Sequence, residues 1–359
     1  MKYIESNNSR LEIGSIEDSS FNEVLGTKYK SSKKVIIVDE NTHISCLEYL
    51  ITTFEQLKDA EVIVLPAGEM NKELGIVNNV WEALTDYGVT RHDLIINLGG
   101  GMITDMGGFI ASCYKRGVDY INIPTSLLGM VDASIGGKTG VNLGEFKNQI
   151  GVFSHPEVVY IDVAFLATLP SEELLSGYGE MLKYGLISDE TLFDILIAQL
   201  KGDQDFSEEI LLTCIGVKNE VVMKDPLENG LRKVLNFGHT IGHVIEGHFM
   251  NGKKMTHGHC VAIGMVMESY ISLKIGLLDE KAYDKIQENI LAFYEMPLYS
   301  NDEINEMVIM LSNDKKNRNG KILCSLLTSI GTCKYDQRVT EELFVEVFLH
   351  FKNLQVNLN

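Results

Sequence analysis

The histidines in the second half of the chain have the spacing of a metal-binding or proton-transferring pair. His239 and His243 are four residues apart, so a helix would place both on one face. We expect Asn236, three residues before His239, to join that face. Two imidazoles can bind a divalent metal, or one can bind it while the other transfers protons; hydrogen bonding within a core is the alternative. Thr240 stands where a His-Glu-x-x-His protease has its general base, which argues against that mechanism.

A glutamate and a third histidine could complete a metal site. Glu180 lies in a helix-like stretch among small and aromatic residues that indicate burial, and a buried carboxylate needs a partner such as a metal. His257 follows the histidine pair, with His259 as a rival ligand. Glu180, His239 and His257 would form a two-histidine, one-carboxylate site with open positions, the pattern of catalytic rather than structural zinc.

Glycines and polar residues follow the strand-like segments of the first half. Residues 93–98 lead into Gly99-Gly100-Gly101, where backbone amides could approach a pyrophosphate at the start of the next helix. The pattern differs from Gly-x-Gly-x-x-Gly, and a tight turn is the alternative. Asp39, at the end of an earlier strand, could accept a hydrogen bond from a ribose hydroxyl. Other strands are followed by further polar residues: Glu69, Lys72, Thr125 and Ser126. We therefore expect a dinucleotide site.

A second glycine-containing segment carries positive charge for an anion. Lys138 follows Gly136-Gly137, but the segment lacks the first glycine of Gly-x-x-x-x-Gly-Lys-Ser/Thr, so ATP use is unsupported. The segments nearby offer further polar groups: Arg116, Asp132, Lys147 and Asn148. Lys183, one helical turn after Glu180, shares a helix face with it, where a solvated ion pair is the alternative to a buried site.

Composition limits the partners of the chain. It has 359 residues, 45% of them hydrophobic, with a net charge of −19, which disfavours nucleic acid and anionic membranes. Six scattered cysteines without a Cys-x-x-Cys pair favour reduced thiols and a cytoplasmic location. No apolar run reaches 18 residues, so we expect no membrane span.

The elements that must position these residues change in character near residue 170. Short β-branched runs alternating with helix-like segments predict a parallel sheet with helices on both faces. The expected strands are 34–39, 61–65, 93–98, 120–124 and 158–162, with helix-like segments over 43–58 and 73–87. The expected later helices are 171–185, 189–201, 206–224, 231–248, 258–276, 279–294 and 302–313, with a strand-like stretch at 322–327. We predict a Rossmann-like α/β domain over 1–170 and a mostly α-helical, metal- and substrate-binding domain over 171–359. The active site is expected where the carboxyl ends of the strands face the helical domain.

Taken together and in this order, the motifs resemble those of the 3-dehydroquinate synthases, of the sugar phosphate cyclase superfamily. The resemblance extends from about Val35 to Gly331. The motifs that carry it are Gly99-Gly100-Gly101 with Asp105, Pro124-Thr125-Ser126, Val131-Asp132 through Gly136-Gly137-Lys138-Thr139, Gly179-Glu180-Met181-Leu182-Lys183-Tyr184-Gly185, Leu235-Asn236-Phe237-Gly238-His239-Thr240-Ile241-Gly242-His243, His257-Gly258 and Asp314-Lys315-Lys316.

The resemblance implies a site, cofactors and an assembly. Metal ligands would be Glu180, His239 and His257, usually to Zn²⁺, with Co²⁺ as an alternative. NAD would contact Asp39, Glu69, Lys72, Gly100, Gly101, Asp105, Thr125, Ser126, Lys147 and Thr168. Substrate and phosphate contacts would be Arg116, Asp132, Lys138, Asn148, Lys183, Lys218, Arg232, Asn236, His243 and one of Lys315 and Lys316, with Lys316 favoured. A homodimer is also implied.

The implied reaction converts 3-deoxy-D-arabino-heptulosonate 7-phosphate to 3-dehydroquinate and phosphate, in the shikimate route to aromatic amino acids. Other sugar phosphate cyclases, a metal-dependent polyol dehydrogenase and a catalytically silent binding protein are the rivals. Arg232, Asn236 and His243 favour dehydroquinate synthase over cyclases whose substrates lack a carboxylate. The chain departs from the family pattern at His259, where glutamate is expected, and at Gly144-Glu145-Phe146, where Gly-Lys-Asn is frequent.

Overall fold

The computed structural model describes residues 1–144, 146–203, 206–249, 255–312 and 322–358. The contacts within the chain divide it into two compact units. The first comprises Met1–Leu174 and Leu211–Pro226, and the second comprises Leu175–Ile210 and Leu227–Asn359. Helix α8 (Glu208–Lys224) therefore lies mostly in the first unit, although it follows residue 170 in the sequence.

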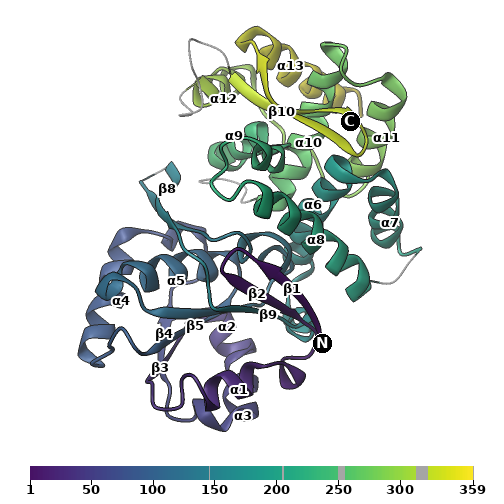
Figure 1. Ribbon diagram of the computed structural model, residues 1–359. Helices are drawn as coiled ribbons and strands as arrows, with labels where there is room; N and C mark the ends of the chain where they lie inside the picture. Colours follow the sequence, from purple (N-terminus) through teal and green to yellow (C-terminus); the bar gives the residue numbers. More distant parts are fainter. Residues whose placement is uncertain (145, 204–205, 250–254, 313–321, 359) are drawn as a thin grey trace. The chain divides into compact units, whose positions relative to one another are not determined.

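The first unit is built on a seven-stranded sheet (Figure 1). All neighbouring strands in it are parallel except β1 and β2, which pair antiparallel at one edge. Its order is β1 (Lys2–Ser6), β2 (Ser9–Ile13), β9 (Val158–Ile161), β6 (Asp119–Pro124), β5 (Leu94–Gly99), β3 (Lys34–Asp39) and β4 (Glu61–Leu65). The apolar runs of β3 and β5 are completely buried, as expected for central parallel strands. The strands predicted at 34–39, 61–65, 93–98, 120–124 and 158–162 are all present, while β1 and β2 were not predicted.

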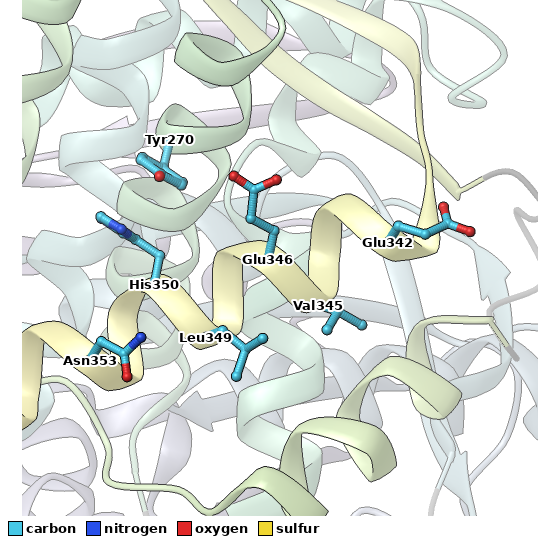
Figure 2. A pocket seen from close by; sticks show the side chains of 7 residues that line it. All are labelled: Tyr270, Glu342, Val345, Glu346, Leu349, His350 and Asn353. Atoms are coloured by element: carbon cyan, nitrogen blue, oxygen red, sulfur yellow. The ribbon is translucent and has the colours of Figure 1, made fainter.

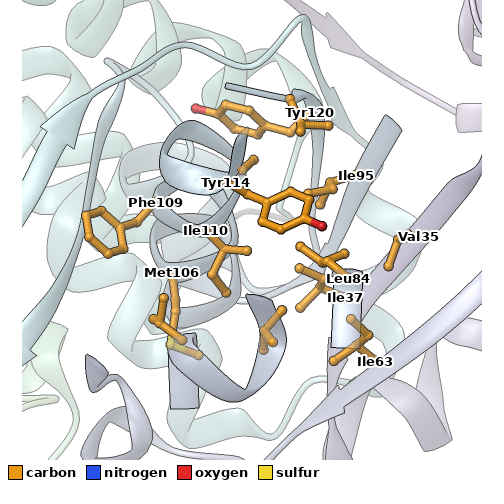
Figure 3. Close-up of a cluster of buried hydrophobic side chains, with 14 of the residues drawn as sticks. Val35, Ile37, Ile63, Leu84, Ile95, Met106, Phe109, Ile110, Tyr114 and Tyr120 are labelled. Carbon is orange, nitrogen blue, oxygen red and sulfur yellow. The ribbon is translucent and has the colours of Figure 1, made fainter. Parts of the chain in front are cut away.

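Helices of the first unit bury the apolar faces of the sheet. They are α1 (Phe21–Gly26), α2 (Glu40–Ser45), α3 (Leu47–Thr53), α4 (Leu74–Asp86), α5 (Gly101–Cys113) and most of α8. Figure 3 shows one apolar cluster, in which Leu84 of α4 and Ile110 of α5 lie against Ile37 and Ile95 of the strands. This packing fixes the start of α5, which begins at Gly101, the third of the three glycines.

An antiparallel hairpin outside the main sheet carries several of the predicted anion-binding residues. It consists of β7 (Lys138–Leu143) and β8 (Phe146–Phe153), neither of which was predicted as a strand. Its strands approach closely at Gly140 and Gly151, where an added Cβ would lie 2.7 Å from the Ile150 carbonyl oxygen and 2.3 Å from that of Thr139, respectively. Strand β7 also packs against α5.

The second unit is mostly helical, as predicted. Its main elements are α6 (Ser171–Ser188), α7 (Glu190–Lys201), α9 (His239–Phe249), α10 (His257–Lys274), α11 (Glu280–Leu291), α12 (Asn301–Ser312), α13 (Glu341–Leu358) and the hairpin β10 (Ile322–Ser329) with β11 (Thr332–Val339). The four residues Ser171–Leu174 of α6 are grouped with the first unit, and α13 was not predicted. Within the described ranges, no helix has the length and apolarity needed to cross a membrane.

The single helix predicted over 231–248 is wrong. The structure has a 3₁₀ helix, η7 (Leu231–Asn236), and a separate helix α9 that begins at His239. Gly238 separates them with φ +81°, and an added Cβ there would lie 2.4 Å from Cγ of Met265. The chain thus turns in the left-handed region, which favours glycine, so Asn236 does not share a helical face with His239.

Candidate functional site

Three ligand-type atoms converge inside the second unit. Glu180 of α6 is completely buried, and its Oε1 lies 3.4 Å from Nε2 of His239 and 3.5 Å from Nε2 of His257. This Oε1 has no hydrogen-bond partner. A buried carboxylate oxygen without a hydrogen bond, between two imidazole nitrogens, is the donor set that a divalent metal takes.

Both histidines are held by their other ring nitrogen. Nδ1 of His239 lies 3.2 Å from the carbonyl oxygen of Phe237, and Nδ1 of His257 lies 3.2 Å from Oε2 of Glu246. In the neutral form of each imidazole, an Nδ1–H donated to these oxygens leaves the lone pair of Nε2 facing Glu180. Such outer partners orient a ligating imidazole and fix its tautomer.

The charges around Glu180 keep it ionised. Lys183, one turn along α6 and 1% exposed, donates to Oε2 of Glu180. Burial alone raises the pKa of Glu180, but the ammonium of Lys183 and the imidazole of His239 hold it well below its usual range. Burial lowers the pKa of His239, which favours its neutral, ligating form. Burial also lowers the pKa of His257, but Glu246 and Glu180 together raise it to about 10.

His243 joins the cluster from the next turn of α9. The ligand atoms of His239, His243 and His257 lie within 4.8 Å of one another. The His243 ring is more exposed than the other two, with its centroid 5.2 Å from that of His239. His259, which the sequence offered as a rival to His257, does not join the cluster: its Nε2 lies 2.8 Å from the carbonyl oxygen of Glu295.

The residues before α9 add polar groups to the second unit. Arg232 is buried on η7, with 1% of its surface exposed. The amide of Asn236 donates to Oε1 of Glu228 at 2.7 Å. Glu228 is held with φ +59°. A buried guanidinium in this segment can grip a carboxylate or phosphate with paired hydrogen bonds.

The glycine loop of the first unit is tightly packed at the carboxyl ends of β5 and β6. The nitrogen of Thr125 donates to the carbonyl of Gly99 at 3.0 Å, which ties the two strand ends together. An added Cβ would lie 3.1 Å from Oγ of Ser126 at Gly100 and 3.0 Å from Cβ of Ala133 at Gly101. Helix α5 begins here without a side-chain cap, so its first amides can meet an anion.

Asp39 and Thr168 lie at other strand ends of this unit. Asp39 ends β3 and caps α2, because its Oδ1 accepts from the nitrogen and hydroxyl of Thr42. Thr168 ends a 3₁₀ turn that follows β9, and its hydroxyl donates to Phe165 at 3.3 Å. The capped Asp39 is fixed in orientation, as a ribose acceptor must be.

Lys72 joins the predicted nucleotide residues to the hairpin. Its Nζ is 2% exposed and lies 2.6 Å from Oδ2 of Asp105, 2.7 Å from Oδ1 of Asn148 and 3.8 Å from Oε1 of Glu69. Asn142 supports this network, since its Oδ1 accepts from the nitrogen of Asn148, which has φ +50°. Its Nδ2 donates to the carbonyl of Glu69 at 3.2 Å.

The remaining predicted residues of the first unit differ in burial. Lys218 of α8 is buried and forms an ion pair of 2.6 Å with Asp132. Lys138 at the start of β7 and Arg116 are exposed, and Lys147 is half-buried. Arg116 has φ +65°. Lys315 and Lys316 lie outside the described residues.

Three functional candidates were missed in the sequence: Asn142, Glu246 and Glu268. Glu246 follows His239 and His243 at i+7 and i+3, so helical spacing could have revealed it. Glu268 is an isolated acid in an apolar stretch of α10, and it is completely buried. Asn142 gave no signal, because its role depends on the unpredicted hairpin.

A surface groove on the second unit lies apart from these residues. It has a volume of about 430 Å³ and is lined by Tyr270 and residues of α13 (Figure 2). His350 stacks on Tyr270 there, with ring centroids 4.1 Å apart. None of the predicted site residues lines this groove, so we assign it no part in the chemistry.

Comparisons with known proteins agree with the motifs. Residues 62–176 match the family model described as 3-dehydroquinate synthase N-terminal, and residues 177–317 match that described as 3-dehydroquinate synthase C-terminal. The chain belongs to the 3-dehydroquinate synthase family. The family predicted from the motifs is thereby confirmed.

Individual relatives and a solved structure agree with this family assignment. A 3-dehydroquinate synthase of Parabacteroides distasonis is 38% identical over 88% of this chain and 90% of its own. Another, of Streptococcus mutans, is 43% identical over 80% and 82%. The solved 2-epi-5-epi-valiolone synthase of Streptomyces hygroscopicus subsp. jinggangensis, with NAD⁺ and Zn²⁺ bound, superposes with a TM-score of 0.81 at 28% identity, covering 98% of this chain and 97% of its own. The predicted fold class is confirmed.

Proposed function

We propose that this chain is a 3-dehydroquinate synthase that converts 3-deoxy-D-arabino-heptulosonate 7-phosphate to 3-dehydroquinate and phosphate. The observation that carries the proposal is the convergence of Oε1 of Glu180 with Nε2 of His239 and of His257, in a member of this family. Relatives that bear this name are 38% and 43% identical to the chain.

The proposed cofactors are a divalent metal, Zn²⁺ or Co²⁺, and NAD. Glu180, His239 and His257 would hold the metal, and the buried Oε1 without a hydrogen bond fits that role. The crowded glycines at the start of α5 fit a dinucleotide pyrophosphate, with Asp39 placed for a ribose hydroxyl. When bound, NAD supplies transient hydride acceptance and the metal supplies Lewis acidity.

Cationic residues of the chain would hold the phosphate and the substrate carboxylate. Lys138, Asn148 and Lys183 are proposed to bind the phosphate before and after it leaves, and Arg232 to grip the carboxylate through paired hydrogen bonds. Lys218 is held by Asp132, so its ammonium keeps a fixed place for a substrate oxygen.

His243 is our candidate for proton transfer to and from the substrate. It lies next to His239 and is more exposed, so a substrate oxygen can reach its ring. The amide of Asn236, already oriented by Glu228, would bind a neighbouring substrate group.

The test is phosphate release by the purified protein with the heptulosonate phosphate, NAD⁺ and Zn²⁺. We expect phosphate to be released without net NADH, because the hydride returns to the substrate. Activity only on a sugar phosphate without a carboxylate would indicate another cyclase. NADH accumulation with a polyol would indicate a dehydrogenase, and the absence of all three signals would indicate a silent binding protein.

A cytoplasmic homodimer completes the proposal. All six cysteines are free thiols, which supports a reducing compartment. The exposed Arg116 is proposed to reach the phosphate of the partner subunit. If so, mixing R116A and E180Q subunits should restore activity, up to about a quarter of the parent's, since half the chains form mixed dimers with one intact site. A monomer by sedimentation would contradict the dimer, and no restoration on mixing would contradict the action of Arg116 across it.

A further inference from the structure

Glu268 lies behind the proposed metal centre, where the mechanism above does not use it. It is completely buried on α10, and both of its carboxylate oxygens accept hydrogen bonds from the start of α9. Oε2 accepts from the nitrogen of Gly238 at 2.7 Å, and Oε1 accepts from that of Ile241 at 3.0 Å. A buried carboxylate is stable only when such hydrogen bonds replace water.

The hydrogen bond to Gly238 continues to His239 through one peptide group. The nitrogen of Gly238 and the carbonyl of Phe237 belong to the same peptide, and that carbonyl lies 3.2 Å from Nδ1 of His239. The chain of contacts therefore runs from the carboxylate of Glu268, through the peptide, to the imidazole. A carboxylate on the N–H side polarises the peptide and makes its carbonyl a stronger acceptor.

The backbone around this peptide leaves no room for another arrangement. An added Cβ at Gly264 of α10 would lie 2.0 Å from the carbonyl oxygen of Gly238, and one at Gly242 would lie 2.9 Å from that of Cys260. Helices α9 and α10 thus meet backbone to backbone, which places Glu268 beneath the first turn of α9. Gly238, with φ +81°, presents its nitrogen to that carboxylate.

We propose that Glu268 is a positioning residue for the metal centre, which orients His239 and strengthens its Nε2 as a ligand through the Phe237–Gly238 peptide. The inference rests on the proposed metal site. His257 has its own carboxylate, Glu246, in direct contact. Each histidine ligand is then supported by an acid, one directly and one through a peptide.

The experiment compares the parent with E268Q, in which the side chain keeps its shape but can accept only through one oxygen. We expect the affinity for Co²⁺, measured by competition with a chelator, to fall about 10–100-fold, as for outer partners of metal-bound histidine. The visible spectrum of bound Co²⁺ and the Nδ1–H resonance of His239 in the metal-free protein should both shift. S272A is the matched control, since Ser272 is buried on α10 and its hydroxyl donates to the carbonyl of Glu268 within the same helix.

The outcomes distinguish the metal site from the chain of contacts that runs from Glu268 through the Phe237–Gly238 peptide to His239, which we call the relay. Co²⁺ affinity within twofold of the parent, with an unshifted spectrum and an unshifted His239 resonance, would overturn the role of Glu268. A parent that binds no Co²⁺ would overturn the proposed function, while the His239 resonance would still test the relay. If E268Q does not fold, the amides of Gly238 and Ile241 in the metal-free parent decide: slow hydrogen exchange supports the relay, and free exchange overturns it.

Discussion

The metal cluster of the second unit and the glycine loop of the first unit select their ligands with different parts of the chain. The cluster consists of side chains from three helices. Glu180 is completely buried, both histidines are half-buried, and each of the three is held by a partner. The proposed nucleotide loop would use backbone amides at strand ends, where an added Cβ would lie 3.1 Å from Oγ of Ser126 at Gly100 and 3.0 Å from Cβ of Ala133 at Gly101. Removing a side-chain atom should therefore damage the cluster, while adding one should damage the loop.

The comparison is tested most severely by E180Q. The substitution removes the charge that pairs with the buried ammonium of Lys183, and removing one partner of a buried ion pair typically costs about 3–5 kcal/mol of stability. We expect bound Zn²⁺ to be lost and phosphate release to fall by more than about 10³-fold, beyond the 10–100-fold typical of outer partners. Metal analysis and a phosphate assay measure both.

E172Q is the control for that variant. Glu172 lies on the same helix, α6, but is exposed at its first turn. Metal content and turnover should match those of the parent. If E180Q kept its Zn²⁺, the metal would be held elsewhere and the first half of the comparison would be wrong.

The glycine loop is tested by G100A. The added Cβ would lie 3.1 Å from Oγ of Ser126, beside the start of α5 that we propose binds the pyrophosphate. Overpacking of this kind costs about 1–3 kcal/mol, so the KM for NAD⁺ should rise about 10–100-fold. The Co²⁺ spectrum of the protein should not change, because the metal ligands all belong to the second unit.

G216A is the matched control for G100A. Gly216 lies within α8, and a Cβ there would have nothing within 4 Å. Alanine in a helix interior should stabilise the protein by about 0.5–1 kcal/mol and leave the KM for NAD⁺ unchanged. A similar rise in KM for both variants would show that general strain, rather than the loop, determines NAD⁺ affinity.

The two regions also differ in how far the sequence predicts them. The helical period pointed to His239 and His243, which lie one turn apart on α9, and small and aromatic neighbours pointed to a buried Glu180. The structure brings Glu180, His239 and His257 together from three helices. The period failed at Asn236, where the positive φ of Gly238 ends one helix before the next begins. Hairpin β7–β8 was missed because its glycines interrupt the alternation that marks a strand.

A milder test of the cluster is the pH dependence of metal binding. Glu246 and Glu180 raise the pKa of His257 to about 10 against the effect of burial, so the metal-free protein holds a proton there at neutral pH. The metal must displace this proton, so affinity should rise with pH, by up to about tenfold per unit between pH 7 and 9. Chelator competition at several pH values measures the slope.

E246Q sharpens the pH test. Without the carboxylate of Glu246, the pKa of His257 falls, and the slope above pH 7 should flatten even though overall affinity decreases. An unchanged slope would mean that another group releases the proton. The KM for NAD⁺ is expected to be the same in E246Q as in the parent.

The smallest expected effect is that of N142A, which removes a side chain from β7 in the first unit. The nitrogen of Asn148 and the carbonyl of Glu69 each lose a partner, at about 1 kcal/mol per hydrogen bond. Asn148 would then leave its left-handed conformation more easily, so kcat/KM should fall about tenfold, with metal content unchanged. N78A is the control, because Asn78 is exposed on α4 and its amide donates to Oε1 of Glu82 on the same helix. Since side chains here act by holding backbone in place, a loss of metal in N142A would show that the two regions are coupled rather than separately built.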